Sequence, residues 1–142
     1  MRIALAADHA GYELKEALRL KLATQGHALQ DFGAHNGERS DYPDFALQAA
    51  RAVGEGKADR AILMCGSGIG MCISANKIRG VRAAVLRTEE DATLSRSHND
   101  ANVACFGSRM TSVDAVERLT NLFLATAFEG GRHADRVRKI ES

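Results

Sequence analysis

The chain has 142 residues, of which 45% are hydrophobic and 26% are charged, and its formal net charge is +1. These values are typical of a single domain with a buried core, and they give no electrostatic basis for binding nucleic acid. No apolar run approaches the roughly 20 residues that a membrane span needs. The three cysteines are odd in number and lack metal-ligand spacing, so we expect a reduced, cytoplasmic protein with no membrane partner.

The first part of the chain begins with an apolar run over residues 2–7, which predicts a buried strand. An apolar stripe predicts a helix over 12–25, and a short strand follows over 27–32. Asp8 and His9 follow the first strand, at the sheet edge where open α/β folds bind ligands. Each also has an ordinary structural explanation, as a helix N-cap for Asp8 and as a polar turn residue for His9.

The middle of the chain holds a polar loop over 33–44, which contains the only proline, and a predicted helix over 45–53. A second buried strand is predicted over 61–64, directly before Cys65. A further helix is predicted over 71–77. This order places Cys65 at the same sheet edge as the residues that follow the first strand.

The turn between this strand and this helix has the features of an anion-binding loop. Backbone N–H groups converge in such a turn, and the positive end of the helix dipole favours negative charge. A helix N-terminus also favours the thiolate form of a cysteine, so we expect Cys65 to be nucleophilic or basic near neutral pH. The turn residues are Gly66, Ser67, Gly68, Ile69 and Gly70.

Three common loop motifs do not fit this turn. The dinucleotide fingerprint requires a third glycine where Met71 stands, and the phosphate loop of NTPases requires a Gly-Lys-Ser/Thr ending. A cysteine phosphatase requires an arginine six residues after its cysteine, and that position is also Met71. Two interpretations remain: an anion site beside a reactive thiol, and a buried cysteine above an ordinary turn.

The remaining elements complete an alternating pattern. We expect a strand over 82–86, a helix over 88–97 capped by Thr88, a strand over 103–106 and a helix over 112–128. Alternation of strands and helices predicts the α/β class. The expected fold is a three-layer αβα sandwich with a Rossmann-like, five-stranded parallel sheet.

Polar residues near the last strand and in the C-terminal segment are further candidates. His98 and Asn99 come shortly before the strand, and Arg109 follows its carboxyl end. Arg132 and Arg136 are four residues apart, so they share one helical face. Two guanidinium groups on one face suit a phosphate ester, although a solvated basic helix end is the alternative explanation.

Six segments of the chain together resemble the ribose-5-phosphate isomerase B family, within the wider ribose/galactose isomerase group. They span nearly the whole chain in the family's order. They are Ala-Ala-Asp-His-Ala-Gly (6–11), Asp-Tyr-Pro-Asp-Phe-Ala (41–46), Cys-Gly-Ser-Gly-Ile-Gly-Met (65–71), Ser-Ala-Asn-Lys (74–77), Ser-His-Asn-Asp-Ala-Asn-Val (97–103) and Phe-Glu-Gly-Gly-Arg-His (128–133).

The resemblance implies an intramolecular oxidoreductase, which catalyses the aldose–ketose isomerisation of a phosphorylated sugar through an enediolate, with no metal or other cofactor. Cys65 would be the base that moves a proton between C1 and C2, and His98 would assist opening of the furanose ring. Asp8 and Ser67 would hold hydroxyl groups near the reacting carbons. The N–H groups of residues 66–70 would stabilise the enediolate.

The resemblance also implies how the site is shared between subunits. The family is dimeric or tetrameric, and a neighbouring subunit would supply His98, Asn99 and Arg109, with Asn99 contacting the sugar. The C-terminal helix, at about 132–140, is expected to pack on that subunit. The implied phosphate-binding residues are His9, Arg109, Arg132 and Arg136.

Ribose 5-phosphate and ribulose 5-phosphate, in the pentose phosphate pathway, are the leading substrate pair. Relatives isomerise allose 6-phosphate, galactose 6-phosphate or four-carbon sugar phosphates, and a non-catalytic sugar-phosphate-binding subunit is a further alternative. The presence of Cys65, Ser67 and His98 together favours an enzyme. If any residues gathered round an ion, they would be Asp8, His9 and His98, but we expect no metal site.

Overall fold

The computed structural model describes residues 1–142 and has an α/β fold with three layers. Its five strands form one all-parallel sheet in the order β2-β1-β3-β5-β4, which confirms the expected fold class. The chain therefore moves from β1 to one side of the sheet and then, from β3 onwards, to the other. The strands are β1 (Arg2–Ala7), β2 (Ala28–Asp31), β3 (Arg60–Cys65), β4 (Ala83–Val85) and β5 (Val103–Gly107).

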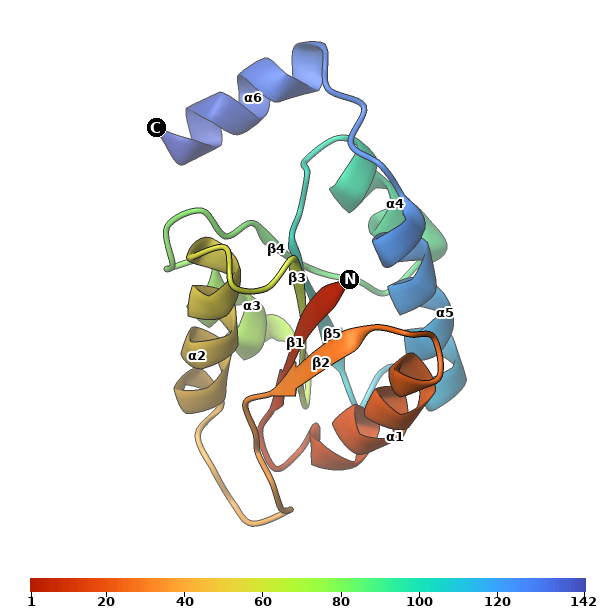
Figure 1. Cartoon of the computed structure of the whole chain (residues 1–142). Coiled ribbons are helices and arrows are strands. Elements are labelled where there is room, and N and C mark those ends of the chain that lie inside the picture. Colours follow the sequence, from red (N-terminus) through yellow and green to blue (C-terminus); the bar gives the residue numbers. More distant parts are fainter.

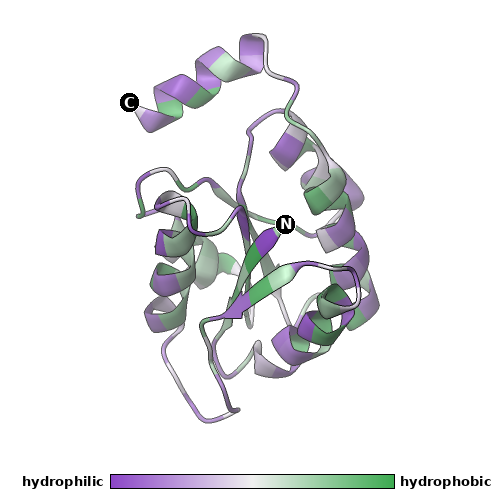
Figure 2. Ribbon diagram, in the orientation of Figure 1, coloured by the Kyte–Doolittle hydropathy of each residue, from purple (hydrophilic) through white to green (hydrophobic).

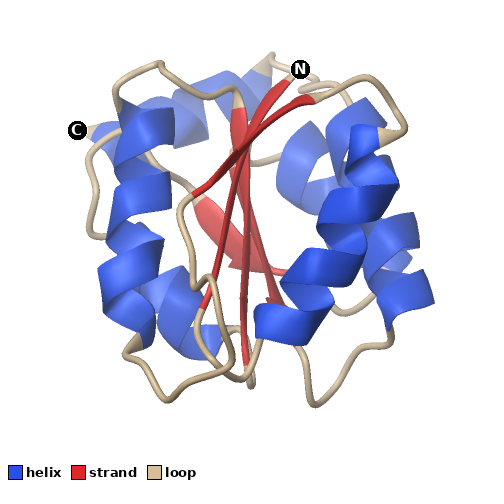
Figure 3. Cartoon of the chain, turned by 60° about the horizontal axis from the view of Figure 1, so that its bottom comes forward, coloured by secondary structure: helices blue, strands red, loops and turns tan.

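Helices cover both faces of this sheet (Figure 1, Figure 3). One face packs against α1, α4 and α5, and the other packs against α2 and α3. None of the helices is long and apolar enough to cross a membrane. The helices are α1 (Tyr12–Ala23), α2 (Tyr42–Gly54), α3 (Ile69–Ala75), α4 (Glu89–Ser97), α5 (Val113–Ala125) and α6 (Arg132–Glu141).

The apolar residues of each central strand alternate between the two faces. In β3, Ile62 and Met64 pack toward α1 and α5, whereas Leu63 and Cys65 pack toward α2 and α3. Because both faces of the central strands are buried, β1 and β3 are apolar after their first residues and β5 is apolar throughout. Figure 2 shows green along much of the sheet and on the inner sides of the helices. The alternation fixes which side of the sheet the Cys65 thiol occupies.

The sheet has its topological switch point between β1 and β3. The loop that leaves β1 leads to α1 on one face, and the loop that leaves β3 leads to α3 on the other face. Loops therefore separate beyond the carboxyl ends of β1 and β3, and ligands of open α/β sheets bind in that crevice. The Asp8 backbone N–H donates to the Met64 carbonyl at 3.3 Å, which joins the two loops at this edge.

Several predicted boundaries differ from the observed ones. The helix predicted over 112–128 ends at Ala125, because Thr126 is extended and its carbonyl accepts a hydrogen bond from the buried Arg96 side chain. The helix predicted from residue 71 begins two residues earlier, at Ile69. The predicted cap is confirmed, because the Thr88 hydroxyl and the Asp91 carboxylate form a capping box.

The C-terminal helix α6 lies apart from the three layers, at the amino-terminal edge of the sheet (Figure 1). His133 near its start stacks on His98, and Glu141 at its end pairs with Arg82 at 2.6 Å. Its apolar Ile140 is 60% exposed. The helix is thus held at its two ends and leaves much of its surface without an intramolecular partner.

Candidate active site

A cavity of about 390 Å³ lies at the switch point, beyond the carboxyl ends of β1 and β3. Its walls come from the loops that follow β1, β3 and β5 and from the start of α2 and α3. Eight of the predicted site residues line it: Asp8, His9, Cys65, Gly66, Ser67, Ile69, Gly70 and Arg109.

Cys65 is the last residue of β3 and is 4% exposed, with its side chain at the cavity wall. Its Sγ accepts a hydrogen bond from the Gly68 backbone N–H at 3.2 Å, and the Ser67 hydroxyl accepts one from the Ile69 N–H at 3.2 Å. Two of the five expected anion-binding N–H groups are therefore already paired with side chains of the loop itself.

Asp8 is buried, and its Oδ1 accepts hydrogen bonds from the N–H groups of Ala10 at 3.0 Å and Gly11 at 3.1 Å. The N-cap of α1 is Gly11, which has no side-chain cap, so the helix N-cap considered for Asp8 is wrong. Asp8 instead holds the turn that precedes α1, and this leaves Oδ2 available to the cavity. His9 is exposed, and its Nδ1 accepts a hydrogen bond from the Ser40 N–H at 3.2 Å. The same nitrogen lies 3.2 Å from the Ser40 carbonyl oxygen, so either tautomer of His9 finds a hydrogen-bond partner there.

The guanidinium group of Arg109 lies over Gly66 of the same chain. A side chain at position 66 would come within 3.0 Å of the Arg109 guanidinium carbon, and the Arg109 N–H donates to the Gly66 carbonyl at 3.1 Å. The expectation that Arg109 comes from a neighbouring subunit is therefore wrong. The loop after β5 already reaches the cavity of its own subunit, because β5 lies next to β3 in the sheet.

Tyr42 also lines the cavity, although it is not among the site residues predicted from the sequence. Its ring lies against Gly70, where an added Cβ would approach the ring atoms to 2.5 Å. The ring is 40% exposed, so it borders the cavity and also faces solvent. Its presence in the segment 41–46 was the available signal, since that segment carried part of the resemblance.

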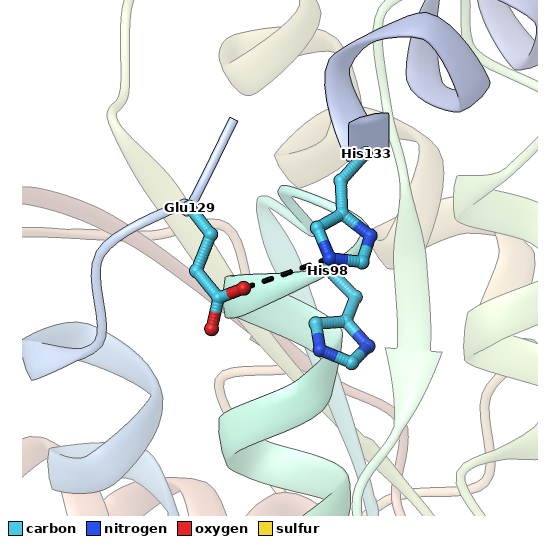
Figure 4. Close-up of side chains that lie close together, drawn as sticks. All are labelled: His98, Glu129 and His133. Carbon is cyan, nitrogen blue, oxygen red and sulfur yellow. Dashed lines mark ion pairs between the residues drawn. The ribbon is translucent and has the colours of Figure 1, made fainter. Parts of the chain in front are cut away.

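A second group of predicted residues lies at the opposite, amino-terminal edge of the sheet. His98 caps the end of α4, and its ring stacks on His133 with centroids 4.2 Å apart and planes inclined by 12°. The Glu129 carboxylate lies 3.5 Å from Nε2 of His133 (Figure 4). Burial, and then the neighbouring charges of His98 and Arg132, lower the pKa of His133 below its ordinary value. Glu129 and His133 are not among the site residues predicted from the sequence.

The two groups are separated by the length of the sheet. The Ala61 N–H donates to the Asn102 carbonyl, so the segment that carries His98 and Asn99 lies where β3 begins, whereas Cys65 lies where β3 ends. Four residue steps of about 3.3 Å separate Ala61 from Cys65, so the two edges are roughly 13 Å or more apart.

This separation also shows which predicted residues one chain does not bring together. Arg132 and Arg136 lie on α6 beside His98, so within one chain they do not meet the other two expected phosphate-binding residues, His9 and Arg109. Asp8 and His9 likewise lie at the opposite edge from His98, so within one chain the three do not gather round an ion. The signal was available, since His98 precedes a strand whereas Cys65 follows one.

Comparisons with known proteins agree with this architecture. The model of the ribose/galactose isomerase family matches residues 3–140. Ribose-5-phosphate isomerase B of Escherichia coli is 42% identical over 98% of this chain and 93% of its own length. D-erythrulose-4-phosphate isomerase of Pectobacterium atrosepticum is 38% identical over 99% of this chain and 93% of its own.

Solved structures give the same result. Ribose-5-phosphate isomerase B of Clostridium thermocellum superimposes with a TM-score of 0.98 at 45% identity, covering 99% of this chain and 95% of that one. The enzyme of Mycoplasma genitalium, solved with bound ribulose-5-phosphate, has a TM-score of 0.94 at 39% identity, over 99% and 93% of the two chains.

The fold and these relatives together define the class of the protein as a sugar-phosphate isomerase. The chain belongs to the ribose/galactose isomerase family. The relatives support the isomerase class, and the description as an oxidoreductase gains no support from them.

Proposed function

We propose that the protein interconverts ribose 5-phosphate and ribulose 5-phosphate, with Cys65 as the base and residues 1–142 acting as one catalytic domain. The observation that carries this proposal is the position of Cys65, whose Sγ accepts the Gly68 N–H at the wall of a cavity that Asp8, Ser67 and Arg109 also line. A proton alpha to a carbonyl needs both a positioned base and stabilisation of the developing negative charge, and this cavity offers both.

The proposed reaction begins from the open-chain aldose. The Cys65 thiolate takes the proton from C2, the electron pair forms the C1–C2 double bond, and the carbonyl oxygen on C1 becomes an enediolate oxygen. The thiol then returns the proton to C1, while the O2 proton moves to O1 and C2 becomes the carbonyl carbon. Oδ2 of Asp8 and the Ser67 hydroxyl hold the two oxygens, and N–H groups of residues 66–70 stabilise the charge.

We further propose that each active site is completed by a second copy of the chain. His98 and Asn99 lie at the opposite sheet edge from Cys65, so they reach a Cys65 site only from another subunit. The exposed apolar side chains of Ile69 and Ile73, which line the cavity, support coverage by a partner. An isologous dimer, alone or as a dimer of dimers, then contains two equivalent sites.

In that arrangement the phosphate is bound from both sides. His9 and Arg109 come from the subunit that supplies the base, and Arg132 and Arg136 come from α6 of its partner. The position of α6, apart from its own three layers, supports packing against the second subunit. His98 of the partner assists opening of the furanose ring, and the phosphate fixes the far end of the sugar so that C1 and C2 meet the thiolate.

The experiment that tests the substrate assignment is a turnover assay with four-, five- and six-carbon aldose phosphates, compared by kcat/KM. We expect the five-carbon substrate to have the highest value. A higher kcat/KM for a tetrose phosphate, or for allose or galactose 6-phosphate, would assign that sugar phosphate as the substrate instead, still within the same family. Binding without turnover of any of them would support the non-catalytic sugar-phosphate-binding subunit instead.

A further inference from the structure

The cluster of His98, Glu129 and His133 has the composition of a transition-metal site. Each side chain offers one ligand atom, and these atoms all lie within 4.8 Å of one another. The three come from two separate segments, the end of α4 and the start of α6 with the loop before it, and Figure 4 shows them facing one another. His133 is only 6% exposed, so one ligand is held rigidly by its surroundings.

We propose that His98, Glu129 and His133 form an inhibitory binding site for Zn²⁺ or a similar divalent transition-metal ion. Two imidazoles and one carboxylate are a set that binds zinc with three protein ligands and leaves the fourth position open. Nitrogen ligands favour such ions over Mg²⁺ and Ca²⁺, which prefer oxygen. The proposal is independent of the sugar chemistry, because the metal takes no part in isomerisation.

Binding requires only small side-chain movements. Ligand atoms about 2.0–2.2 Å from a tetrahedral ion lie a little over 3 Å apart, and the distance from the Glu129 carboxylate to Nε2 of His133 is already 3.5 Å. The two rings are nearly parallel, so their lone pairs do not yet point to one position. His98 is partly exposed at the end of α4 and turns its ring toward the ion, while the exposed Glu129 carboxylate completes the set.

Nearby charges shape the specificity of this site. Arg132 and Arg136 act electrostatically on His133 and oppose a cation, whereas Glu129 favours one. Affinity therefore depends on direct metal–ligand bonds rather than on the local field, which again selects an ion that binds imidazole strongly. Occupancy stops isomerisation because it removes His98 from ring opening, and this consequence alone rests on the proposed function.

The test is titration of the full-length, EDTA-treated protein with ZnCl₂ in a calorimeter, followed by titration with CoCl₂ in a spectrophotometer. We expect one zinc ion per chain, and visible Co²⁺ bands typical of tetrahedral nitrogen and oxygen ligands. Glu129→Gln and His133→Asn each remove a ligand and should weaken the zinc Kd by about tenfold or more. Asp135→Asn is the matched control, since it removes an exposed carboxylate of α6 outside the cluster and should leave the Kd unchanged.

Circular dichroism of each variant separates lost binding from lost folding. We expect Glu129→Gln to fold normally, because the Glu129 side chain is 60% exposed. Unchanged zinc affinity in Glu129→Gln overturns the proposal, and so does a thiolate-to-Co²⁺ charge-transfer band that disappears in Cys65→Ala. In the isomerase assay, zinc should inhibit the unmodified protein more strongly than Glu129→Gln. A protein that turns over no sugar phosphate would refute the proposed function, while calorimetry would still report on the metal site.

Discussion

Cys65 differs from the other two cysteines in what surrounds its sulfur. It lies at the wall of the cavity and accepts a hydrogen bond from a backbone N–H. Cys105 is completely buried in the sheet, and Cys72 lies on α3 outside the cavity lining. We predict that Cys65→Ala lowers kcat by about 10²-fold to 10⁴-fold, the usual contribution of a positioned base, and leaves the Kd for ribose 5-phosphate nearly unchanged. Steady-state kinetics and calorimetry measure the two quantities. Lost affinity together with near-normal turnover would contradict the role, and Cys72→Ser should behave as the unmodified protein.

Cys72 should be the thiol that reacts most readily outside the cavity. A hydrogen bond from Cys105, together with smaller ones from the Val85 backbone and Asn76, lowers the pKa of Cys72 to about 7. The thiolate is therefore the main form above that pH. We expect its rate of alkylation by iodoacetamide to rise up to pH about 7 and then level off, whereas an ordinary cysteine continues to gain reactivity up to about 8.5.

Peptide mass spectrometry across a pH series measures this rate for each cysteine separately. Cys105 is the internal control, because burial raises its pKa well above the ordinary value and shields it from the reagent. A Cys72 rate that still rises steeply above pH 8 would show that the hydrogen bond from Cys105 does not stabilise the thiolate.

At the scale of secondary-structure elements, the start of α3 can pack against the start of α2 only because residue 70 is a glycine. A methyl group at Gly70 would meet the Tyr42 ring at 2.5 Å, so either the ring or the loop that holds Cys65 must move. We predict that Gly70→Ala lowers kcat/KM by up to about 100-fold, since a displacement near 1 Å is enough for such a loss. Gly37→Ala is the control, because its nearest neighbour lies 4.0 Å away and its φ is not in the left-handed region. Equal kinetics for the two variants would exclude Tyr42 and Gly70 as determinants of the site.

Substitution of the arginines on α6 tests whether they bind phosphate. Arg132 and Arg136 are exposed and carry no hydrogen bond or ion pair within the chain, whereas Arg138 on the same helix pairs with Asp135. We predict that Arg132→Ala and Arg136→Ala each raise KM about 10-fold to 100-fold, as expected for the loss of a charge-assisted contact of about 1.5–3 kcal/mol. Arg138→Ala should leave KM unchanged. Unaltered KM in both of the first two variants would favour a merely solvated helix.

At the scale of the whole molecule, the separation of Cys65 from His98 permits a direct test of a shared site. Cys65→Ala and His98→Asn should each be inactive alone. If each site takes Cys65 from one subunit and His98 from the other, then in a mixed dimer one site receives both substitutions and the other receives neither. We therefore expect activity to reappear after subunit exchange, at about half of the normal level per mixed dimer if the two sites act independently.

Native mass spectrometry establishes that exchange has occurred, and turnover is measured in the same mixture. A mixture of Cys65→Ala with Cys65→Ala/His98→Asn is the matched control, since no combination of its subunits restores the base. Confirmed exchange without recovery in the first mixture would mean that both residues act within one chain. That result would contradict the roughly 13 Å or more that separates the two sheet edges.

The succession of strands and helices along the chain can be predicted from the sequence alone, and so can the sheet edge to which Asp8, His9 and Cys65 belong. Those features depend on local apolar periodicity and on which residues directly follow a strand, and both can be read along the chain. The turn with three glycines and the cap at Thr88 are local in the same sense.

Contacts between residues far apart in the sequence depend on how the elements pack. Arg109 lies over Gly66 because β5 is the neighbour of β3, and Tyr42 lies over Gly70 because α2 and α3 cover the same face. The stacking of His133 on His98 depends on where the chain turns after α5, at Thr126, whose carbonyl is bound by Arg96. Such contacts arise from the packing of segments far apart in sequence, and no local periodicity encodes them.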